Sequence, residues 1–430
     1  MTIHAGILVT GTEVLTGRVV DRNGPWCSER LRELGIEHET TVVVGDRPDD
    51  MAGALEWLRD EGCALIVTSG GLGPTADDLT AEVVGQFQGR EMVLDEELEG
   101  RIAAILERLT RRWPNVDMDA IRAGNRKQAT IPEGSTVLEP VGTAPGLVVP
   151  PTGEEGPTVL VLPGPPRELK PMWDVAVTTE AFQDAVSGRT EIRQEMMRLF
   201  GIPESEIAET LRLATGDGIA LKDLEVTTCM RRGEIEIVTR YEPASQATYE
   251  AFSGFVASRH ADTLFSTDGS SVDVQVAALL REQAMTISVA ESCTGGLVAG
   301  RLTEQPGASE YVAGGVVAYS NEAKRELVGV SEETIASCGA VSPEVALELA
   351  AGIRERLSSD IGVGITGIAG PAGGSEEKPV GLVCFAVSGS GGSIERSIQL
   401  PGSRDDVRDR STTVAMHLVR AFLDQGPKTQ

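Results

Sequence analysis

Residues 64–80 read ALIVTSGGLGPTADDLT, an apolar strand that runs into a glycine loop and then opens a helix. Glycines let backbone N–H groups approach an anion closely, and a helix N-terminus adds a partial positive charge. The adjacent acids Asp77 and Asp78 offer carboxylate oxygens, which suit Mg²⁺ or another hard cation. This stretch therefore predicts an α/β fold with a diphosphate and metal site. A structural alternative remains, in which Thr75 caps the helix and the two acids favour its positive end.

Short apolar strands alternate with amphipathic helices from the start of the chain to about residue 175. Strands are expected at 7–9, 41–44 and 64–68, helices at 25–34, 51–60 and 98–111, and a closing helix from 167. Such alternation predicts a mainly parallel sheet with helices on both faces. Because the carboxyl ends of parallel strands meet at one edge, we expect turn-rich loops at 11–17, 142–146 and 162–166 to lie near the glycine loop.

Two further sections follow. The middle one has a strand at 191–200, a helix opening at 203–205 and ending near 214, and an alternating strand at 234–238. The last one has a helix at 272–283 and a strand at 286–290, after which a strand-loop-helix pattern repeats to a final helix at 405–423. These patterns predict three domains, with boundaries at 1–175, 176–265 and 266–430.

Composition excludes several classes of protein. The 430 residues are 41% hydrophobic and 24% charged, which is typical of a folded globular chain. The formal net charge of −27 argues against a protein that coats nucleic acid, because such affinity comes largely from basic side chains. No run of about 20 apolar residues and no basic leader are visible, so we expect a cytoplasmic protein without membrane contact.

Histidine is scarce, and this restricts the chemistry that the chain can use. None of the four histidines (His4, His38, His260 and His417) lies in a glycine loop or beside other ligand-type residues at metal spacing. A histidine-based zinc site is therefore not expected, and a Ser-His-Asp triad is not favoured. A hydrolase with this sequence needs an oxygen-bound metal or a base other than histidine.

A second candidate centre follows the strand at 286–290, where the chain reads ESCTGG over residues 291–296. A serine on a sharp strand-to-helix turn is exposed, and the N–H groups after it can stabilise an oxyanion. Without a nearby histidine, Ser292 needs another base, and a candidate is Lys324, in the first turn of the helix that follows a strand ending at Tyr319. To act as a neutral base at pH 7, the Lys324 amine needs a pKa about three units below its usual value, and burial lowers the pKa of an amine.

Other interpretations of these residues stay open. Ser292 also fits an anion-binding or capping role, Cys293 is a competing nucleophile, and Lys324 fits a solvated helix position. A second glycine loop, TGIAGPAGGS at 366–375, precedes a final helix in which Arg404 and Arg408 lie one turn apart. Arginine donors form a planar fork that suits phosphate or carboxylate, although a solvent-facing pair is equally compatible with this spacing.

Five motifs of the first section together resemble the N-terminal domain of the CinA (competence/damage-inducible) family, which is related to molybdopterin-binding proteins of the MoaB/MogA type. They are GTEVLTG (11–17), TSGGLGPTADDLT (68–80), NRKQATIPEG (125–134), GTAPG (142–146) and LPGPPREL (162–169). The resemblance implies an ADP-ribose pyrophosphatase that depends on a divalent metal, Mg²⁺ or a transition metal. The implied substrate-binding residues are Gly70, Gly71, Gly73 and Thr143, and the implied metal ligands are Asp77 and Asp78. One departure is Arg22, where the family usually has a small hydroxyl residue in a D-T-N pattern.

The middle section is similar to the small KH-like α+β connecting unit of the same family, on the segments LFGIPESEI (199–207) and RGEIEI (232–237). It contains no G-x-x-G clamp with basic flanks. The KH-like shape is therefore no reason to expect nucleic-acid binding, against which the net charge argues.

The last section resembles the C-terminal α/β domain of the CinA family, which as a separate protein is the nicotinamide mononucleotide deamidase PncC. The motifs are AESCTGG (290–296), AYSNEAK (318–324), GAVS (339–342), TGIAGPAGGSEEKPVG (366–381) and the final arginine helix. The resemblance implies a cofactor-free amidohydrolase in which Ser292 attacks the carboxamide and Lys324 takes and returns the proton. Tyr319, Thr366 and Gly367 would line the substrate site and Arg404 would bind the anionic substrate. One departure is Ser403, where the family often has Asp.

Both resemblances together predict a bifunctional hydrolase of pyridine-nucleotide (NAD) recycling that acts on ADP-ribose and nicotinamide mononucleotide. The family resemblance also implies a homodimer. Two alternatives stay open: a nucleotidyl-transfer enzyme acting on molybdopterin, and a non-catalytic interaction protein associated with competence.

Overall fold

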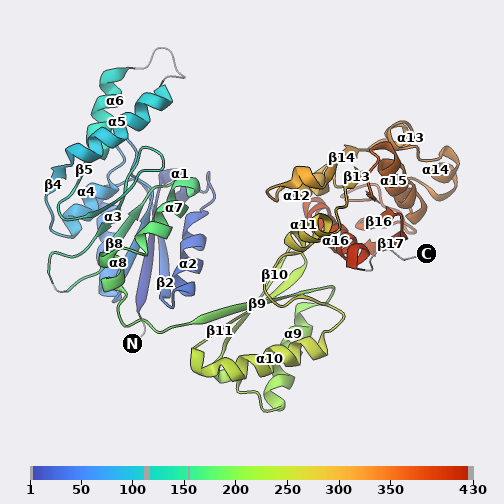
Figure 1. Cartoon of the computed structure of the whole chain (residues 1–430), viewed down its shortest axis with the longest axis horizontal. Helices are drawn as coiled ribbons and strands as arrows, with labels where there is room; N and C mark the ends of the chain where they lie inside the picture. The colour runs from blue at the N-terminus through green and yellow to red at the C-terminus, as the bar shows by residue number, and fades with distance from the viewer. Residues whose placement is uncertain (1–2, 111–116, 154, 425–430) are drawn as a thin grey trace. The chain divides into compact units, whose positions relative to one another are not determined.

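The computed structural model describes residues 3–110, 117–153 and 155–424. The chain forms two compact units, one reaching to Arg193 and including Glu242–Ala244, the other formed by Gln194–Tyr241 and the residues from Ser245 on (Figure 1). Residues of the predicted middle domain thus share a unit with the last section. The division into three domains stays a prediction.

A six-stranded sheet forms the centre of the first unit, in the order β2-β1-β3-β8-β7-β6. Its strands are β1 (His4–Thr10), β2 (Glu37–Val44), β3 (Leu65–Ser69), β6 (Thr136–Leu138), β7 (Gly146–Val149) and β8 (Thr158–Leu162). The first four in this order run parallel, which confirms the predicted parallel sheet, whereas β7 at one side pairs antiparallel with both β8 and β6.

Helices cover both faces of this sheet, because both faces of its strands are apolar. One face packs against α3 (Pro48–Asp60), α4 (Thr80–Phe87) and α5 (Glu96–Thr110), the other against α2 (Asn23–Glu33), α7 (Pro166–Ala176) and α8 (Glu180–Ala185). The predicted end of the 98–111 helix, residue 111, lies outside the described residues. The remaining elements are α1 (Thr12–Leu15), α6 (Met118–Gln128) and the paired strands β4 (Met92–Leu94) and β5 (Thr130–Pro132).

A four-stranded sheet opens the second unit, in the order β10-β11-β9-β12. Its elements are β9 (Arg193–Phe200), α9 (Glu204–Gly216), β10 (Glu225–Arg231), β11 (Glu234–Tyr241), α10 (Gln246–Arg259) and β12 (Leu264–Ser266). Ile207 of α9 and Phe252 of α10 are buried against Ile235 and Ile237 of β11, so the two helices and the sheet share one core.

A five-stranded sheet forms the rest of the second unit, in the order β14-β13-β15-β16-β17. Its strands are β13 (Ile287–Glu291), β14 (Val312–Val317), β15 (Ile361–Gly367), β16 (Leu382–Gly389) and β17 (Gly392–Gln399). One face packs against α11 (Val272–Glu282), α12 (Leu297–Thr303) and α16 (Arg404–Asp424), the other against α13 (Asn321–Val328), α14 (Glu332–Cys338) and α15 (Pro343–Arg356).

Two expectations for this sheet are wrong. The strand-loop-helix pattern does not repeat to the final helix, because β16 and β17 form an antiparallel hairpin across the two-residue turn Ser390–Gly391. The strand before Lys324 ends at Val317 and not at Tyr319, since Ala318 and Tyr319 lead out of the sheet toward α13.

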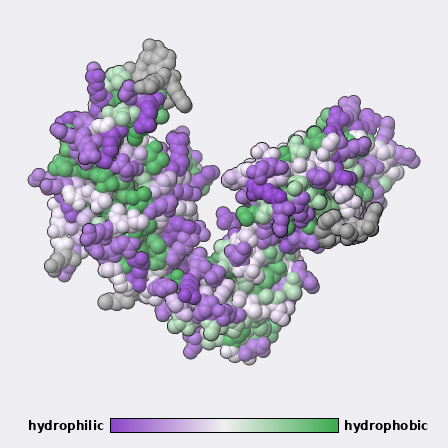
Figure 2. Space-filling view, in the orientation of Figure 1, coloured by the Kyte–Doolittle hydropathy of each residue, from purple (hydrophilic) through white to green (hydrophobic). Residues whose placement is uncertain are grey.

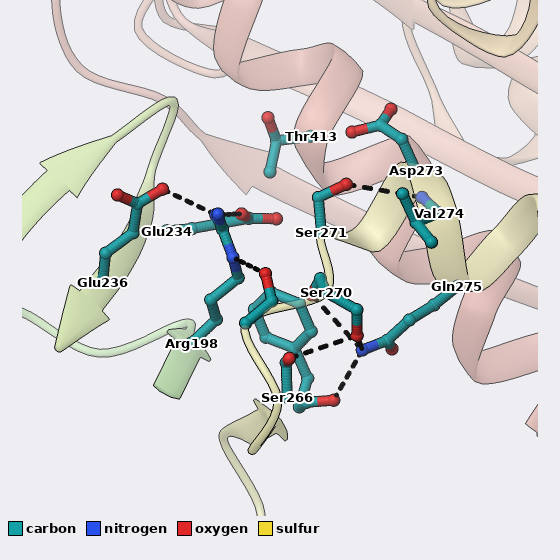
Figure 3. A network of polar contacts seen from close by, with 12 residues as sticks. Arg198, Glu234, Glu236, Ser266, Ser270, Ser271, Asp273, Val274, Gln275 and Thr413 are labelled. Atoms are coloured by element: carbon teal, nitrogen blue, oxygen red, sulfur yellow. Dashed lines mark hydrogen bonds and ion pairs between the residues drawn. The ribbon is translucent and has the colours of Figure 1, made fainter. Parts of the chain in front are cut away.

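Buried charges join the four-stranded sheet to the helices of the five-stranded one. Arg198 of β9 donates from Nη1 to Glu236 Oε1 at 2.6 Å and from Nε to the carbonyl of Gly269 at 2.7 Å (Figure 3). Glu234 of β11 lies 2.7 Å from Nε2 of His417 on α16, and both side chains are buried. The contacts to Gly269 and His417 link the four-stranded sheet to the segment before α11 and to α16, whereas the Arg198–Glu236 pair lies within that sheet.

The visible surface of each unit is mostly hydrophilic (Figure 2), in keeping with the formal net charge of −27. Among residues 3–110, 117–153 and 155–424, no helix combines the length and the apolar character needed to cross a membrane.

Candidate functional site

Ser292 stands directly after β13, where the chain turns sharply into α12. Its N–H donates to the carbonyl of Ile365 at 2.9 Å, which continues the pairing of β13 with β15 by one residue. Gly295 (φ 61°) and Gly296 (φ 96°) then adopt the left-handed conformation that favours glycine. The two glycines therefore produce the sharp strand-to-helix turn that the ESCTGG sequence predicts.

The carboxylate of Glu291 holds the start of α12 in place. Glu291 is fully buried and accepts hydrogen bonds from the N–H groups of Gly296, Val298 and Ala299 at 2.8–3.1 Å. A carboxylate at a helix N-terminus satisfies donors that lack an intrahelical partner. The residue before Ser292 thereby anchors the helix that follows it.

Lys324 and Ser292, 32 positions apart in the chain, are brought together in the structure. Nζ of Lys324 lies 3.1 Å from Oγ of Ser292 and donates to the carbonyl of Tyr319 at 2.9 Å. Lys324 is only 2% exposed. Burial lowers the pKa of its amine below the usual 10.5, while the neighbouring Cys293 thiol acts in the opposite direction. A buried lysine with a lowered pKa can serve as a base toward the adjacent hydroxyl.

Cys293, the competing nucleophile, is unsuited to attack at neutral pH. It is buried, and burial raises the pKa of its thiol to about 12. The thiolate is the reactive form of cysteine, so a thiol with this pKa is a weak nucleophile.

The N–H groups that follow Ser292 are partly occupied. The N–H of Gly295 donates to the carbonyl of Ser292 at 3.1 Å, and that of Gly296 donates to Glu291. The N–H groups of Cys293 and Thr294 lie near the Cys293 sulfur, where they lower the pKa of the thiol and so oppose the effect of burial. Of the expected oxyanion donors, only those of Cys293 and Thr294 are therefore candidates.

The two arginines of the final helix have different environments. Arg408 donates from Nε to the carbonyl of Cys293 and from Nη2 to that of Thr294, each at 3.2 Å, so it fixes the loop after Ser292. Arg404 is exposed and donates to the carbonyl of Gly370 at 2.9 Å and to the hydroxyl of Tyr319 at 3.2 Å. Arg404 thus lies at the rim, beside a tyrosine that is 59% exposed.

Ser403 and Thr366 are both engaged within the protein. Oγ of Ser403 lies 2.7 Å from Oδ2 of Asp406, which also accepts the Ser403 N–H, so the start of α16 is capped without an acid at 403. Thr366 is 1% exposed and donates to the carbonyl of Ala340 at 2.7 Å. A Cβ at Gly367 would lie 2.8 Å from Val383, so this position accepts only glycine without a shift.

In the first unit, the glycine loop borders a cavity of about 760 Å³. The predicted residues Gly70, Gly71, Gly73, Thr143 and Asp78 all line it. Gly70 (φ 108°) and Gly71 (φ 66°) have left-handed backbones, and a Cβ at Gly71 would lie 2.1 Å from Oγ1 of Thr80. The glycines are therefore required by the loop itself.

Asp77 and Asp78 differ in their position. Asp78 lines the cavity, whereas Asp77 does not and is fully exposed. Thr75 donates from its backbone N–H to Oδ2 of Asp78 at 2.9 Å, and its hydroxyl lies within hydrogen-bonding distance of both acids. The hydrogen bond from Thr75 is the main cause that lowers the pKa of Asp77.

The predicted capping role of Thr75 is wrong. Helix α4 begins at Thr80, five residues after Thr75, and Leu79 stands at its N-cap position. The hydrogen bonds between Thr75 and Asp78 form a separate turn before the helix, which delays its start.

Sequence reasoning missed several lining residues of this cavity. Glu13, Gln128 and Glu168 face it from α1, α6 and α7. Gln128 and Glu168 belong to the NRKQATIPEG and LPGPPREL motifs, so these motifs marked the site although neither residue was named as part of it.

Residues at this cavity fit a hard divalent cation. Mg²⁺ is usually held by one or two carboxylates, with water and substrate phosphates completing its shell. Asp78 offers Oδ1, which accepts none of the hydrogen bonds found among the described residues. Among all residues that the structure describes, no group of three or more His, Cys, Asp or Glu side chains is arranged to hold a metal by itself. A metal here would thus require ligands from the substrate or from water.

Comparisons with known proteins match both units. Residues 269–423 match the family described as CinA C-terminal domain, and residues 6–183 match the probable molybdopterin binding domain. A CinA-like protein of Mycobacterium sp. (strain JLS) is 59% identical over 427 residues, covering 99% of this chain and 100% of the relative. A CinA-like protein of Mycobacterium tuberculosis (strain ATCC 25177 / H37Ra) is 54% identical over 431 residues, covering 99% of each chain. The solved structure of the competence/damage inducible protein CihA from Agrobacterium tumefaciens is 38% identical and covers 37% of this chain and 100% of its own, with a TM-score of 0.35.

Proposed function

Because this chain belongs to the CinA-like protein family, we propose that its second unit deamidates nicotinamide mononucleotide by a Ser/Lys mechanism. The observation that carries the proposal is the 3.1 Å approach of Lys324 Nζ to Ser292 Oγ in a buried position. A lysine base must be neutral to accept a proton, and burial favours the neutral form. Cys293 is disfavoured as the nucleophile, because burial raises the pKa of its thiol to about 12.

The reaction proceeds in two halves. Neutral Lys324 accepts the hydroxyl proton of Ser292 as Oγ attacks the carboxamide carbon, and the N–H groups of Cys293 and Thr294 are the candidate donors to the oxyanion. The C–N bond then breaks, and Lys324 gives its proton to the departing NH₂ group, which leaves as ammonia. Water attacks the acyl carbon, Lys324 accepts a proton from the water, and this proton returns to Ser292 as the carboxylic acid is released.

Arg404 is the proposed contact for the phosphate of this substrate. Its guanidinium lies at the exposed rim and is oriented by the carbonyl of Gly370 and the hydroxyl of Tyr319. The planar fork of arginine suits phosphate oxygens. Arg408 is not proposed for this role, because its donors are directed to the carbonyls of Cys293 and Thr294.

We propose a second activity for the first unit, the hydrolysis of ADP-ribose to AMP and ribose 5-phosphate. The supporting observation is the 760 Å³ cavity, which is large enough for a nucleotide and is bordered by the glycine loop and Asp78. The loop would orient the diphosphate, and Asp78 would contribute a ligand for a divalent metal. A bound metal would neutralise diphosphate charge and polarise the reacting phosphorus–oxygen bond.

Ammonia release from nicotinamide mononucleotide tests the first proposal. Wild type should release ammonia, whereas Ser292→Ala and Lys324→Ala should not, and circular dichroism should show all three folded. A folded but inactive wild type would refute the deamidase assignment. Retained activity in Ser292→Ala would refute the nucleophile.

AMP formation from ADP-ribose tests the second proposal. A chelator should stop this reaction and leave ammonia release unchanged, since only ADP-ribose hydrolysis is expected to need a metal. Incubation of the same protein with molybdopterin and ATP separates hydrolysis from nucleotidyl transfer. Transfer without ADP-ribose hydrolysis would favour the molybdopterin alternative.

A further inference from the structure

We propose that Arg22 is the cationic contact for a phosphate group in the cavity of the first unit, which deepens and rests on the proposed ADP-ribose function. Arg22 is the one basic side chain among the described residues that line this cavity. The same cavity is lined by the carboxylates of Glu13, Asp21, Asp78 and Glu168. An anionic ligand is repelled by such a wall unless positive charge compensates for it. Arg22 is therefore the side chain whose positive charge can offset the lining carboxylates when an anionic ligand binds.

The backbone on both sides of Arg22 is anchored. Asp21 accepts the N–H of Asn23 at Oδ1, at 2.9 Å. Asn23 donates from Nδ2 to Oγ of Ser69 at 2.8 Å and to the carbonyl of Gly164 at 2.6 Å. Ser69 directly precedes the glycine loop, and Gly164 lies in the proline-rich loop after β8. These contacts place Arg22 at the cavity wall next to the loop that would bind the diphosphate.

The guanidinium of Arg22 is available for a ligand. Arg22 is exposed, and no hydrogen bond or ion pair found within residues 3–110, 117–153 and 155–424 uses its side chain. In contrast, Asn23 beside it is buried and has both amide N–H contacts described above. The fork of this arginine can take two phosphate oxygens.

Arg22 also distinguishes this chain from the D-T-N pattern that its sequence otherwise resembles. A small hydroxyl at this position could donate one hydrogen bond but would carry no charge. The arginine adds a charge-assisted contact that does not depend on a metal. The ligand class is therefore a phosphate monoester or diphosphate of a nucleoside, and part of its affinity should persist when divalent metal is removed.

Calorimetric titration of the full chain in excess chelator tests this inference. The probes are ADP-ribose, AMP and adenosine, which lacks a phosphate. Arg22→Thr should weaken the binding of ADP-ribose and AMP about tenfold and leave adenosine unchanged, because only a charge-assisted phosphate contact is lost. Arg22→Lys should retain part of the affinity, since it keeps the charge without the fork. Arg18→Thr is the matched control: Arg18 is exposed, stands four residues earlier and does not line the cavity.

Two results would overturn the inference. One is a folded Arg22→Thr variant that binds ADP-ribose and AMP as wild type does; the other is a wild type that binds neither phosphate-bearing probe. If Arg22→Thr loses these ligands but wild type forms no AMP from ADP-ribose with Mg²⁺, the diphosphatase proposal fails while the phosphate contact stands.

Discussion

Arg301 of α12 and Asp273 of α11 form a bidentate ion pair, with Nε 2.5 Å from Oδ1 and Nη2 2.9 Å from Oδ2. The side chains are only 5% and 13% exposed. The third nitrogen, Nη1, donates to the hydroxyls of Thr412 and Thr413 on α16. One guanidinium thus links the helix that follows Ser292 to the helix that carries both arginines of the site.

Replacing this arginine should destabilise the second unit. We expect Arg301→Met to lower the free energy of unfolding by about 3–5 kcal/mol, because Asp273 would be left buried without its cation. Urea denaturation followed by circular dichroism measures the change. Arg212→Met is the control, since Arg212 pairs with Glu209 at the surface and should contribute far less to the free energy of unfolding. Equal losses in the two variants would contradict the role of burial.

The rate of deamidation should rise with pH and reach its plateau at a lower pH than a lysine with an ordinary pKa would give. Activity requires neutral Lys324, and burial lowers its pKa below 10.5, so the rising limb of kcat/KM should have an apparent pKa below that value. Lys324→Arg should reduce turnover by a factor of about 10²–10⁴, since arginine stays charged. Lys222→Arg, at an exposed position, should leave the profile unchanged. A profile without a rising limb would argue against a lysine base.

The stability of the second unit should fall as pH drops below about 6.5. Burial lowers the pKa of His417 in the folded state, so the unfolded chain binds the proton more readily. The stabilisation is therefore fully present above 6.5 and declines as pH falls from there toward the folded-state pKa. His417→Gln should flatten this slope in melting temperatures measured between pH 5 and pH 8. The other histidines affect the pH dependence of wild type and of the variant alike. The effect of His417 is therefore the difference between the two curves of melting temperature against pH.

The glycine loop should be intolerant of a methyl group. Gly71→Ala would place a Cβ 2.1 Å from Oγ1 of Thr80 at a φ of +66°, so we expect both lower stability and loss of ADP-ribose binding. Gly62→Ala is the control, because Gly62 has a φ of +82° but no atom near its Cβ position. It should cost about 1–2 kcal/mol from backbone strain and leave binding intact. Calorimetry and thermal melting separate the two effects.

Local sequence patterns predicted the parallel strands well, because runs such as residues 64–68 are apolar on both faces. They failed at strands that pair antiparallel, although these strands pair with close neighbours in the sequence. The hairpin of β16 and β17 was missed although Ser390–Gly391 is a turn signal, and the antiparallel strands β6 and β7 carried too few residues to stand out. The start of α4 was placed too early because the Thr75 turn resembles a cap.

For the candidate sites, motif order identified residues that lie together but not what each one contacts. Chemistry made Lys324 a candidate partner of Ser292 and the family resemblance implied the pair; the structure brings the two side chains to 3.1 Å. Spacing could not show that Asp77 does not line the cavity, or that Thr366 is buried and donates to the carbonyl of Ala340. The contact of Glu234 with His417 joins residues 183 positions apart, and the RGEIEI motif that contains Glu234 gives no sign of this partner.

The loop after Ser292 receives its clamp from Arg408, a residue of the last described helix. During translation, Ser292 therefore leaves the ribosome long before the side chain that braces its loop has been synthesised. The first unit can fold while the second is still being made, since domains generally form in order of synthesis. A chain that stops before residue 404 would thus lack the contacts that hold the loop after Ser292.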